Sequence, residues 1–588
     1  MGPLSPAPAP QEITRLTRVA LGQEPADLII RGARLVNVFS ERVEEAGALA
    51  VADGRVASLG PELPGWRGPR TEIVEAGGLY LLPGLIDAHT HLDSIFLLGP
   101  YSEMALPRGN TAAVSETGMI AGAWGMAGVR AFLDDAAQVT MRVFHLTPSL
   151  TPPFPAWETS AGMSAEEIAG LLDDPACLGV GETYWPAVID GDPRPPATFA
   201  ASLARGKRVG GHAAGARGEK LMAYAASGVG DCHESTTPEE ALERLRLGLM
   251  VQVREGMVRR EMAAVVPALK DLPDTRLVSL VTDLAPLDEL CELGAMNVLA
   301  SKAVALGVNP ARAVAWCSLN PAQYYRLEGL GAVAPGWLAD LVLVDDLKDF
   351  RARAVLLAGR LVAENGRMLA REPLAAYPAA ASRAMRCRAV TLADLRVPAS
   401  GDSVQVRAAL AVNGTITREA MATARVEDGN ALADPAADLY KMAHINRHAP
   451  GLELGVGFAQ GWGLKAGALA TTLIWDTCNL FGLGSSDAEL ALALNRVREL
   501  GGGWVVVEGD RVLAELPLPL CGVTSTLPVA EIQDKVRACE AALRRLGCPH
   551  ERPFLTAQTF CFTGLPFLRL TNKGLLDVRQ RRLVEVAP

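Results

Sequence analysis

The stretch 82–93, which reads Leu-Pro-Gly-Leu-Ile-Asp-Ala-His-Thr-His-Leu-Asp, constrains the fold of this chain more than any other. Its apolar start is typical of a buried β-strand, and the strand ends in His89 and His91. Side chains two residues apart in a strand project to the same face, so the two imidazoles lie together. Next to Asp87 and Asp93, they can bind a divalent cation that prefers nitrogen and oxygen ligands. Such a pair alone is more often an ordinary polar surface, so further ligands are needed.

The sequence from 83 to 329 alternates short β-type runs with helical patterns, which predicts parallel strands covered by helices. Eight units in about 250 residues is the size of a TIM-type (β/α)8 barrel, which carries its chemistry at the C-terminal strand ends. The predicted strands after the opening one are 111–116, 141–146, 178–183, 208–212, 228–233, 249–254 and 276–283. The fold class is therefore α/β, with this barrel as its largest part.

Metal-ligating side chains occur at the predicted ends of five of these strands. The six residues are His89, His91, Glu182, His212, His233 and Asp283. Half of the eight histidines of the chain fall at these positions, and their joint placement favours a metal site. Six ligands suit two divalent ions with a shared hydroxide, a nucleophile that forms because metal binding lowers the pKa of water. We expect Glu182 to bridge the ions and Asp283 to act as general base and acid.

Short β-type runs also lie on both sides of the barrel, over 28–57 and 339–362. Neither set buries a sheet face alone, so residues 25–82 and 330–380 are expected to form one β-sandwich. Residues 1–24, Pro/Ala-rich at the start and without the pattern of a signal peptide, are expected to be a flexible leader. Residues 385–588 mix strands with helices and predict a C-terminal α/β domain. Its glycines at 455–461 resemble a dinucleotide fingerprint, but their spacing favours packing and turn glycines.

The composition and net charge limit which classes of molecule this protein is expected to bind. The net charge is −10 without a long basic run, which argues against nucleic acid and anionic membranes as partners. No apolar stretch reaches the length of a membrane span. The ten cysteines are scattered and contain no Cys-x-x-Cys pair, which indicates reduced thiols in a cytoplasmic protein. We expect a small heterocyclic molecule as the partner.

Several longer strings point to a family. They are Gly211-His212-Ala213-Ala214-Gly215, Asp231-Cys232-His233-Glu234-Ser235-Thr236-Thr237, Gly331-Ala332-Val333-Ala334-Pro335-Gly336 and Thr571-Asn572-Lys573-Gly574. With them the chain, from about residue 25 to the end, resembles the adenine deaminase family of the amidohydrolase superfamily. The resemblance implies a barrel, a β-sandwich and a C-terminal domain that closes over the site. It also implies a homo-oligomer and two Mn(II) or Fe(II) ions, although the ligand types also suit zinc. The implied reaction is hydrolysis of adenine to hypoxanthine and ammonia, by attack of a metal-bridging hydroxide.

Two segments depart from that family. Where it carries Asp-Pro-His-Glu-Ile, this chain has Glu116-Thr117-Gly118-Met119-Ile120, and where it carries His-Asp-Ser-His-Asn, this chain has Trp475-Asp476-Thr477-Cys478-Asn479. Trp475 and Met119 would make a substrate pocket more apolar and give it a flat stacking surface. The changes are either peripheral, with adenine still the substrate, or a rewritten recognition surface for another cyclic amine, amide or lactam. We favour the second hypothesis; an inactive metal-binding paralogue is a remote third.

The candidate substrate contacts follow from these segments and from the end of the seventh strand. They are Glu116, Met119, Arg254, Glu255, Trp475, Asp476 and Cys478. For Arg254 and Glu255 the alternative is an ion pair that closes the barrel.

Overall fold

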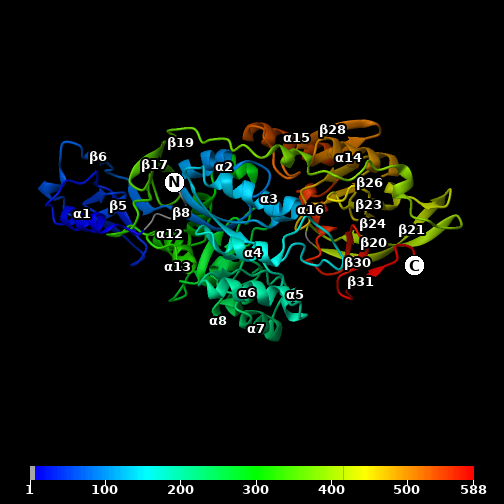
Figure 1. Ribbon diagram of the computed structural model, residues 1–588, viewed down its shortest axis with the longest axis horizontal. Helices are drawn as coiled ribbons and strands as arrows, with labels where there is room; N and C mark the ends of the chain where they lie inside the picture. Colours follow the sequence, from blue (N-terminus) through cyan, green and yellow to red (C-terminus); the bar gives the residue numbers. More distant parts are fainter. Residues whose placement is uncertain (1–6, 415) are drawn as a thin grey trace.

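The computed structural model describes residues 7–414 and 416–588 of the chain. The molecule is elongated, with the N-terminal strands at one end, the β/α units in the middle and the C-terminal sheet at the other end (Figure 1). The site described below lies where the middle part meets the C-terminal part.

Eight parallel strands follow one another around the central part, and the predicted TIM-type barrel is confirmed. Strands β8 to β12 form one sheet in sequence order and β13 to β15 a second. The backbone hydrogen bond from Gly230 N to Val209 O (2.9 Å) joins β12 to β13, and Asp283 N to His89 O (3.1 Å) joins β15 to β8. The bounds are β8 Leu85–Thr90, β9 Asn110–Glu116, β10 Arg142–Thr147, β11 Cys177–Val180, β12 Arg208–Val209, β13 Asp231–Cys232, β14 Met250–Arg254 and β15 Val278–Val281.

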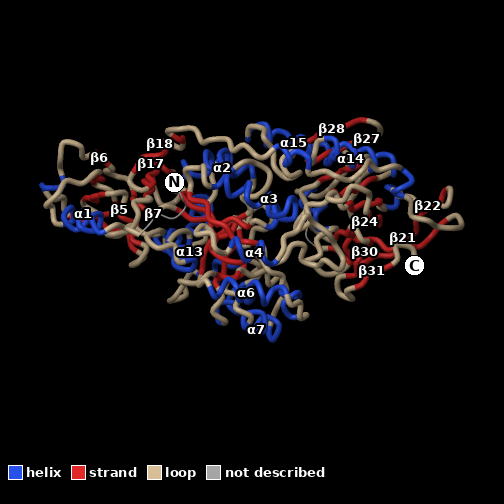
Figure 2. The backbone as a smooth tube through the Cα atoms, viewed as in Figure 1, coloured by secondary structure: helices blue, strands red, loops and turns tan. Residues whose placement is uncertain are grey.

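Helices cover the outside of these strands (Figure 2). Apolar side chains of both kinds of element share buried clusters, as Val251 and Val278 of the strands do with Leu299 of a helix. The helices are α2 Leu98–Ala105, α3 Gly118–Ala136, α4 Ala165–Leu171, α5 Trp185–Ile189, α6 Arg194–Ala204, α7 Gly218–Ala226, α8 Pro238–Arg246, α9 Met262–Leu269, α10 Leu287–Glu292, α11 Met296–Ala305, α12 Pro310–Trp316 and α13 Leu319–Tyr325. Burial of these clusters fixes the strand ends that carry the site.

Strands from both flanks of the barrel pack as two sheets. One sheet has the order β5-β4-β1-β6 and the other β19-β18-β17-β16-β7-β2-β3. Leu49 of the first sheet and Leu343 of the second belong to one buried cluster. The bounds are β1 Leu28–Arg31, β2 Arg34–Asn37, β3 Arg42–Glu45, β4 Ala48–Ala52, β5 Arg55–Gly60, β6 Glu72–Glu75, β7 Tyr80–Pro83, β16 Leu341–Val344, β17 Ala352–Leu357, β18 Arg360–Glu364 and β19 Arg367–Met368. Because β16 pairs with β7, the chain returns to this sheet after completing the barrel.

The prediction of a flexible leader over 1–24 is wrong for part of that segment. Helix α1 (Pro10–Ala20) packs against the N-terminal sheet through Val19, which is fully buried beside Leu16 and Trp66. The indole of Trp66 donates to the carbonyl of Val19 (2.6 Å), and Arg15 donates to Asp27 (3.0 Å). The Pro/Ala-rich start hid the i, i+3 spacing of Leu16 and Val19, which is that of an amphipathic helix.

The C-terminal region is built on a nine-stranded sheet with the order β22-β21-β20-β24-β23-β26-β25-β27-β28. Its strands are β20 Ser403–Ala411, β21 Thr417–Glu427, β22 Asn430–Ala431, β23 Tyr440–Ile445, β24 Leu454–Gln460, β25 Ala468–Thr471, β26 Leu480–Gly484, β27 Gly503–Glu508 and β28 Arg511–Pro517. Helices α14 Asp487–Glu499, α15 Val529–Arg545 and α16 Pro553–Thr559 and the small sheet β29 Leu568–Thr571, β30 Gly574–Asp577 and β31 Arg582–Val584 complete it. The glycines at 455–461 lie largely along β24, where a Cβ on Gly455 would meet the carbonyl oxygen of Thr571 at 2.1 Å, so they allow close packing.

Polar contacts hold the C-terminal region against the barrel. Asn479 donates to the carbonyl of Thr159 (2.8 Å), and Thr563 donates to the carboxylate of Glu158 (2.9 Å). Arg537 of α15 pairs with an acidic side chain of α10 at 2.8 Å. The region therefore covers the loops that follow the barrel strands.

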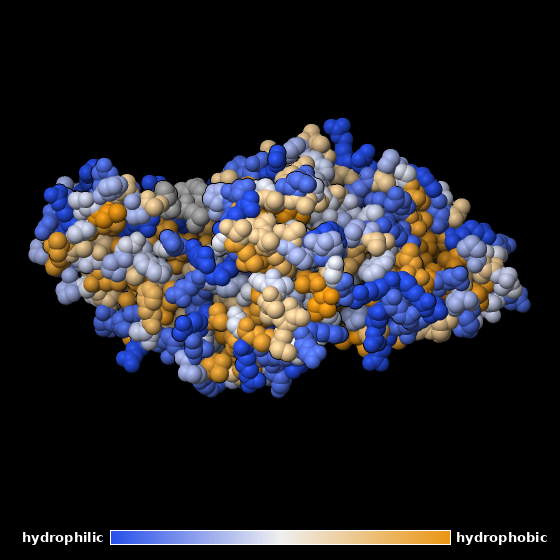
Figure 3. Space-filling view, turned by 60° about the horizontal axis from the view of Figure 1, so that its bottom comes forward, coloured by the Kyte–Doolittle hydropathy of each residue, from blue (hydrophilic) through white to orange (hydrophobic). Residues whose placement is uncertain are grey.

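The outer surface mixes polar and apolar residues. Hydrophilic residues cover much of the face in Figure 3, with apolar patches between them. Within the ranges that the structure describes, no helix is both long and apolar enough to cross a membrane.

Candidate active site

The six predicted ligands converge at the C-terminal ends of the barrel strands. The Nε2 atoms of His89 and His233 lie 3.0 and 3.2 Å from Oε1 of Glu182. His91 Nε2 lies 3.2 Å from Oδ1 of Asp283. Two groups each offer ligand atoms that all lie within 4.8 Å of one another: His89, His91, Glu182 and Asp283, and Glu182, His212 and His233. Since Glu182 belongs to both groups, one carboxylate can serve two adjacent ions.

The nitrogen and oxygen atoms of these side chains are arranged to bind divalent cations rather than to hydrogen-bond with one another. Among the described residues, Nε2 of His89, Nδ1 of His91 and both ring nitrogens of His212 are buried without a hydrogen-bond partner. Buried polar atoms normally find partners, and imidazole nitrogens that surround carboxylate oxygens at about 3–4 Å are arranged like ligands around a cation. The nitrogen and oxygen set suits Mn, Fe or Zn.

The first strand holds its histidines through its two acidic neighbours. Asp87 accepts hydrogen bonds from the backbone and the hydroxyl of Thr282 (3.1 and 2.5 Å), which ties β8 to the end of β15. Asp93 accepts from the backbone N–H of Ile120 (2.9 Å) in the first turn of α3. Both carboxylates thus fix the geometry around the histidines, and neither belongs to the two groups of candidate ligands.

Arg254 orients Asp283 from the opposite side. Arg254 is 1% exposed, and its guanidinium donates to Oδ2 of Asp283 (2.9 Å) and to both oxygens of Glu261 (3.1 Å each). Burial by itself would raise the pKa of Asp283, but the nearby imidazoles of His89 and His91 and the charge of Arg254 hold the pKa of this carboxyl well below its usual range. Arg254 also lines the pocket, and its ion pairs with Glu234, Glu261 and Asp283 are of the kind considered as the alternative to a substrate contact.

Sequence reasoning missed Glu234, the residue directly after His233. Its carboxylate accepts from Arg254 (2.5 Å) and lies 3.5 Å from Nε2 of His233. Burial opposes ionisation, but the charges of Arg254 and then His212 lower the pKa of Glu234 far below its ordinary value. Its position beside a ligand at a strand end was the available signal.

A pocket opens from the six candidate metal ligands toward the C-terminal region. Its walls come from the strand ends, from the segments that directly follow them and from two segments of the C-terminal region. The lining includes His91, Glu116, Gly118, Met119, Leu150, Glu182, Tyr184, His212, His233, Glu234, Arg254, Val258, Arg259, Asp283, Trp475, Asp476, Phe562 and Leu565. Trp475 and Phe562 meet edge to face, with ring centroids 5.0 Å apart. Five of the seven candidate substrate contacts therefore line this pocket.

Glu116 lies between the pocket and the ligand cluster. Its Oε1 accepts from the backbone N–H of Glu182 (3.2 Å) and lies 3.6 Å from Nδ1 of His89. Burial, and then the charge of Glu182, raise the pKa of Glu116 to about 8. Glu116 therefore contacts two of the candidate metal ligands as well as facing the pocket.

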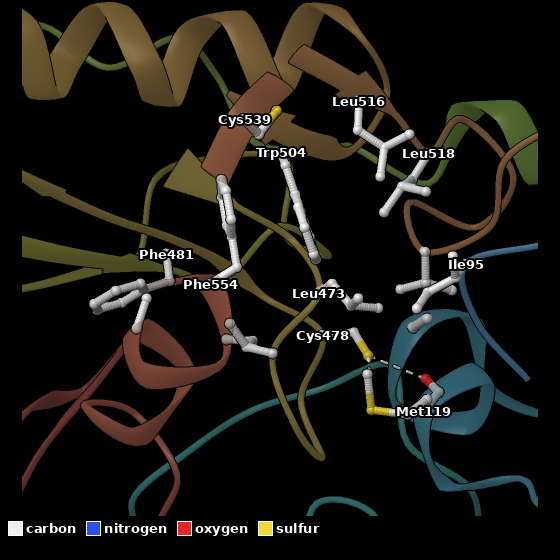
Figure 4. Packing of buried hydrophobic residues seen from close by; sticks show 14 of the residues in the cluster. Ile95, Met119, Leu473, Cys478, Phe481, Trp504, Leu516, Leu518, Cys539 and Phe554 are labelled. Atoms are coloured by element: carbon white, nitrogen blue, oxygen red, sulfur yellow. Dashed lines mark hydrogen bonds between the residues drawn. The ribbon is translucent and has the colours of Figure 1, made fainter. Parts of the chain in front are cut away.

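The other two candidates do not line the pocket. Glu255 pairs with Lys302 (3.0 Å) and accepts from the backbone of Met262, so it joins the seventh strand to the helices outside the barrel. Cys478 is fully buried and lies behind Met119, with its Sγ 3.2 Å from the Met119 carbonyl oxygen and 4.0 Å from its sulfur (Figure 4). Cys478 thus supports the pocket wall rather than forming it.

Asp476 reaches the pocket from the C-terminal region. The hydroxyl of Tyr184, two residues after Glu182, donates to its Oδ1 (2.8 Å). Burial raises the pKa of Asp476 to about 7 against the effect of this hydrogen bond. Tyr184 was not predicted, because no pattern in the sequence marks a side chain that acts through a distant carboxylate.

The barrel and its donor set define a metal-dependent hydrolase of the amidohydrolase class. The Amidohydrolase family model matches residues 80–362, and the adenine deaminase C-terminal domain matches residues 414–582. A curated adenine deaminase of Moorella thermoacetica is 37% identical over 586 residues, with 98% of each chain covered. One of Kosmotoga olearia is 32% identical, with 97% of this chain and 98% of that protein covered. The chain belongs to the adenine deaminase family.

Among solved structures, a β-aspartyl dipeptidase of Fervidobacterium islandicum is similar to this chain, with a TM-score of 0.46 and 17% sequence identity. The similarity covers 58% of this chain and 98% of that one.

Proposed function

We propose that this protein hydrolyses adenine to hypoxanthine and ammonia. The carrying observation is the convergence of four histidines, Glu182 and Asp283 at one end of the barrel, beside a pocket that the C-terminal region completes. Its full-length relatives, at 32–37% identity, are named adenine deaminases.

Two divalent ions would be held by the two groups of ligands that share Glu182. Manganese or iron is the metal we propose first, and zinc also suits these ligands. When bound, such ions lower the pKa of water and so supply a hydroxide nucleophile at neutral pH.

The protein's own groups would orient the base and move the proton. Asp283, with one oxygen held by Arg254 and the other facing the histidines, is placed to take a proton from the attacking water. The same oxygen would return the proton to the leaving nitrogen, which departs as ammonia. Trp475 and Phe562 offer aromatic surface for the base and exclude water from the pocket.

A second candidate reaction is the same chemistry on another cyclic amine, amide or lactam, which the sequence alone favoured and which the full-length similarity to adenine deaminases places second. It is favoured by Met119 and Trp475, two pocket residues that stand where the family pattern has glutamate and histidine. A pocket with fewer hydrogen-bonding groups tolerates less polar ligands and holds polar ones less tightly.

A deamination assay separates these alternatives. The protein is expressed with iron chelated, reloaded with Mn(II) and given adenine, while absorbance and released ammonia are followed. Efficient turnover that is lost in Asp283→Asn supports the proposal. No ammonia from adenine with two metals bound per chain would exclude adenine and direct the search to less polar cyclic amides.

We also propose a homo-oligomer in the cytoplasm. All ten cysteines are free thiols, which fits a reducing compartment. Light scattering behind a gel-filtration column measures the mass in solution, and a monomer would contradict the first of these proposals.

A further inference from the structure

Asp476 lies in a loop whose backbone has an unusual conformation and packs tightly against the barrel. Its backbone adopts φ +65°, a left-handed conformation that few residues other than glycine adopt. The close approach of Gly122 in α3 leaves no room for a side chain, because a Cβ there would lie 1.9 Å from the Asp476 carbonyl oxygen. Helix α3 therefore packs directly against this strained loop. Backbone strain of this kind is concentrated at ligand-binding sites.

The carboxylate of Asp476 has one oxygen engaged and one unused. Tyr184 donates to Oδ1, while Oδ2 is buried and has no hydrogen-bond partner among the described residues. Asp476 lines the same pocket as Glu182, His91 and Asp283. A buried carboxylate oxygen that faces a pocket without a partner is an acceptor for a ligand N–H.

The proposed function, on which this inference rests, limits which N–H that is. A neutral adenine molecule carries donors only on its amino group and on one imidazole nitrogen. The amino group must lie beside Glu182 and Asp283, because it leaves in the reaction. The donor that remains for Asp476 is the imidazole N–H.

We propose that Asp476, positioned by Tyr184, is a specificity-determining residue that accepts a hydrogen bond from the imidazole N–H of the substrate. The enzyme would thus select bases with a free imidazole N–H. A base methylated at N7 or N9 has no proton to donate there, and the buried oxygen of Asp476 would lose its partner.

Binding provides a test that does not depend on turnover. Dissociation constants of adenine and 9-methyladenine are measured by calorimetry on Mn(II)-loaded Asp283→Asn protein, in which catalysis is blocked. With Asp476 present, 9-methyladenine should bind about 10- to 100-fold more weakly than adenine. Adding Asp476→Ala should weaken adenine binding and bring the ratio close to one. If Asp476→Ala does not fold, Asp476→Asn replaces it, since its amide can donate to an unprotonated ring nitrogen and should also flatten the ratio.

The outcomes separate this inference from the proposed function. An unchanged ratio in the Asp476 variants would overturn the inference, even if wild-type protein deaminates adenine. A ratio that depends on Asp476 in a protein that releases no ammonia would overturn the proposed reaction and keep the recognition role. Equal losses for both bases would mark Asp476 as merely structural. If adenine does not bind at all, both proposals fail.

Discussion

Replacing Arg254 by methionine tests whether one buried cation holds the acidic side of the site together. Arg254 is buried, and its guanidinium donates to Glu234, Asp283 and Glu261, all of them also buried. Methionine keeps much of the apolar volume but removes the charge and every donor. Three carboxylates then face one another without their shared partner.

The size of the effect follows from this burial. Removing one partner of a buried ion pair costs about 3–5 kcal/mol, because it leaves an uncompensated buried charge. For a barrel of this size, that corresponds to a fall in melting temperature on the order of 10 °C. The fall should be largest in protein stripped of metal, since bound cations would replace part of the missing positive charge.

Thermal unfolding followed by circular dichroism measures the change, with Arg537→Met as the matched control. Arg537 also pairs with two acidic residues, but its side chain is about half exposed, and exposed pairs contribute about 0–1 kcal/mol. If both variants lower the melting temperature equally, burial is not what makes the Arg254 contacts important, and the reasoning is wrong.

Three further predictions address pH, metal and loop geometry. Burial, and then the charge of Asp476, raise the pKa of Glu158 from 4.5 to about 8, so its stabilising effect is complete below pH 4.5 and is lost as pH rises through 8. The free energy of unfolding, measured by denaturant titration from pH 5 to 8, should therefore fall less steeply in Glu158→Gln than in wild type, by up to about 1.4 kcal/mol per pH unit; equal slopes would contradict this. Glu182→Gln should retain metal at least about tenfold more weakly than wild type when bound metal is measured by mass spectrometry, whereas the exposed Glu292→Gln should not. Gly122→Ala should raise KM for the substrate without lowering metal content, because its methyl group displaces the Asp476 loop; an unchanged KM would show that the loop position is unimportant.

The convergence of the six candidate metal ligands was predictable because, in a barrel, residues at the C-terminal ends of different strands lie close together in space. Once the β-type runs are recognised as parallel strands, every strand end lies on the same face, and His212, His233 and Asp283 must approach His89. No distance had to be known in advance. The same logic could have included Glu234, which occupies such an end directly after His233.

The pocket was less predictable because its walls come from loops of separate regions. Phe562 and Leu565 follow α16 in the C-terminal region, and no periodicity in the sequence indicates that they cover the barrel. Glu255 lies away from the pocket for a simpler reason. Adjacent strand residues point to opposite faces, so when Arg254 faces the pocket, Glu255 faces the helices and meets Lys302.

The departures from the family pattern fit one another in space. Met119 follows the second barrel strand and Cys478 lies in the C-terminal region, yet the Cys478 sulfur contacts both the carbonyl oxygen and the sulfur of Met119. A histidine at 478 facing a glutamate at 119 would bring two polar groups together at this buried position, whereas cysteine and methionine bring two apolar ones. The buried contact is thus matched in polarity on both sides. This match explains how Met119, in the pocket wall, and Cys478, behind it, share one buried contact without leaving a polar side chain of the pair unpartnered.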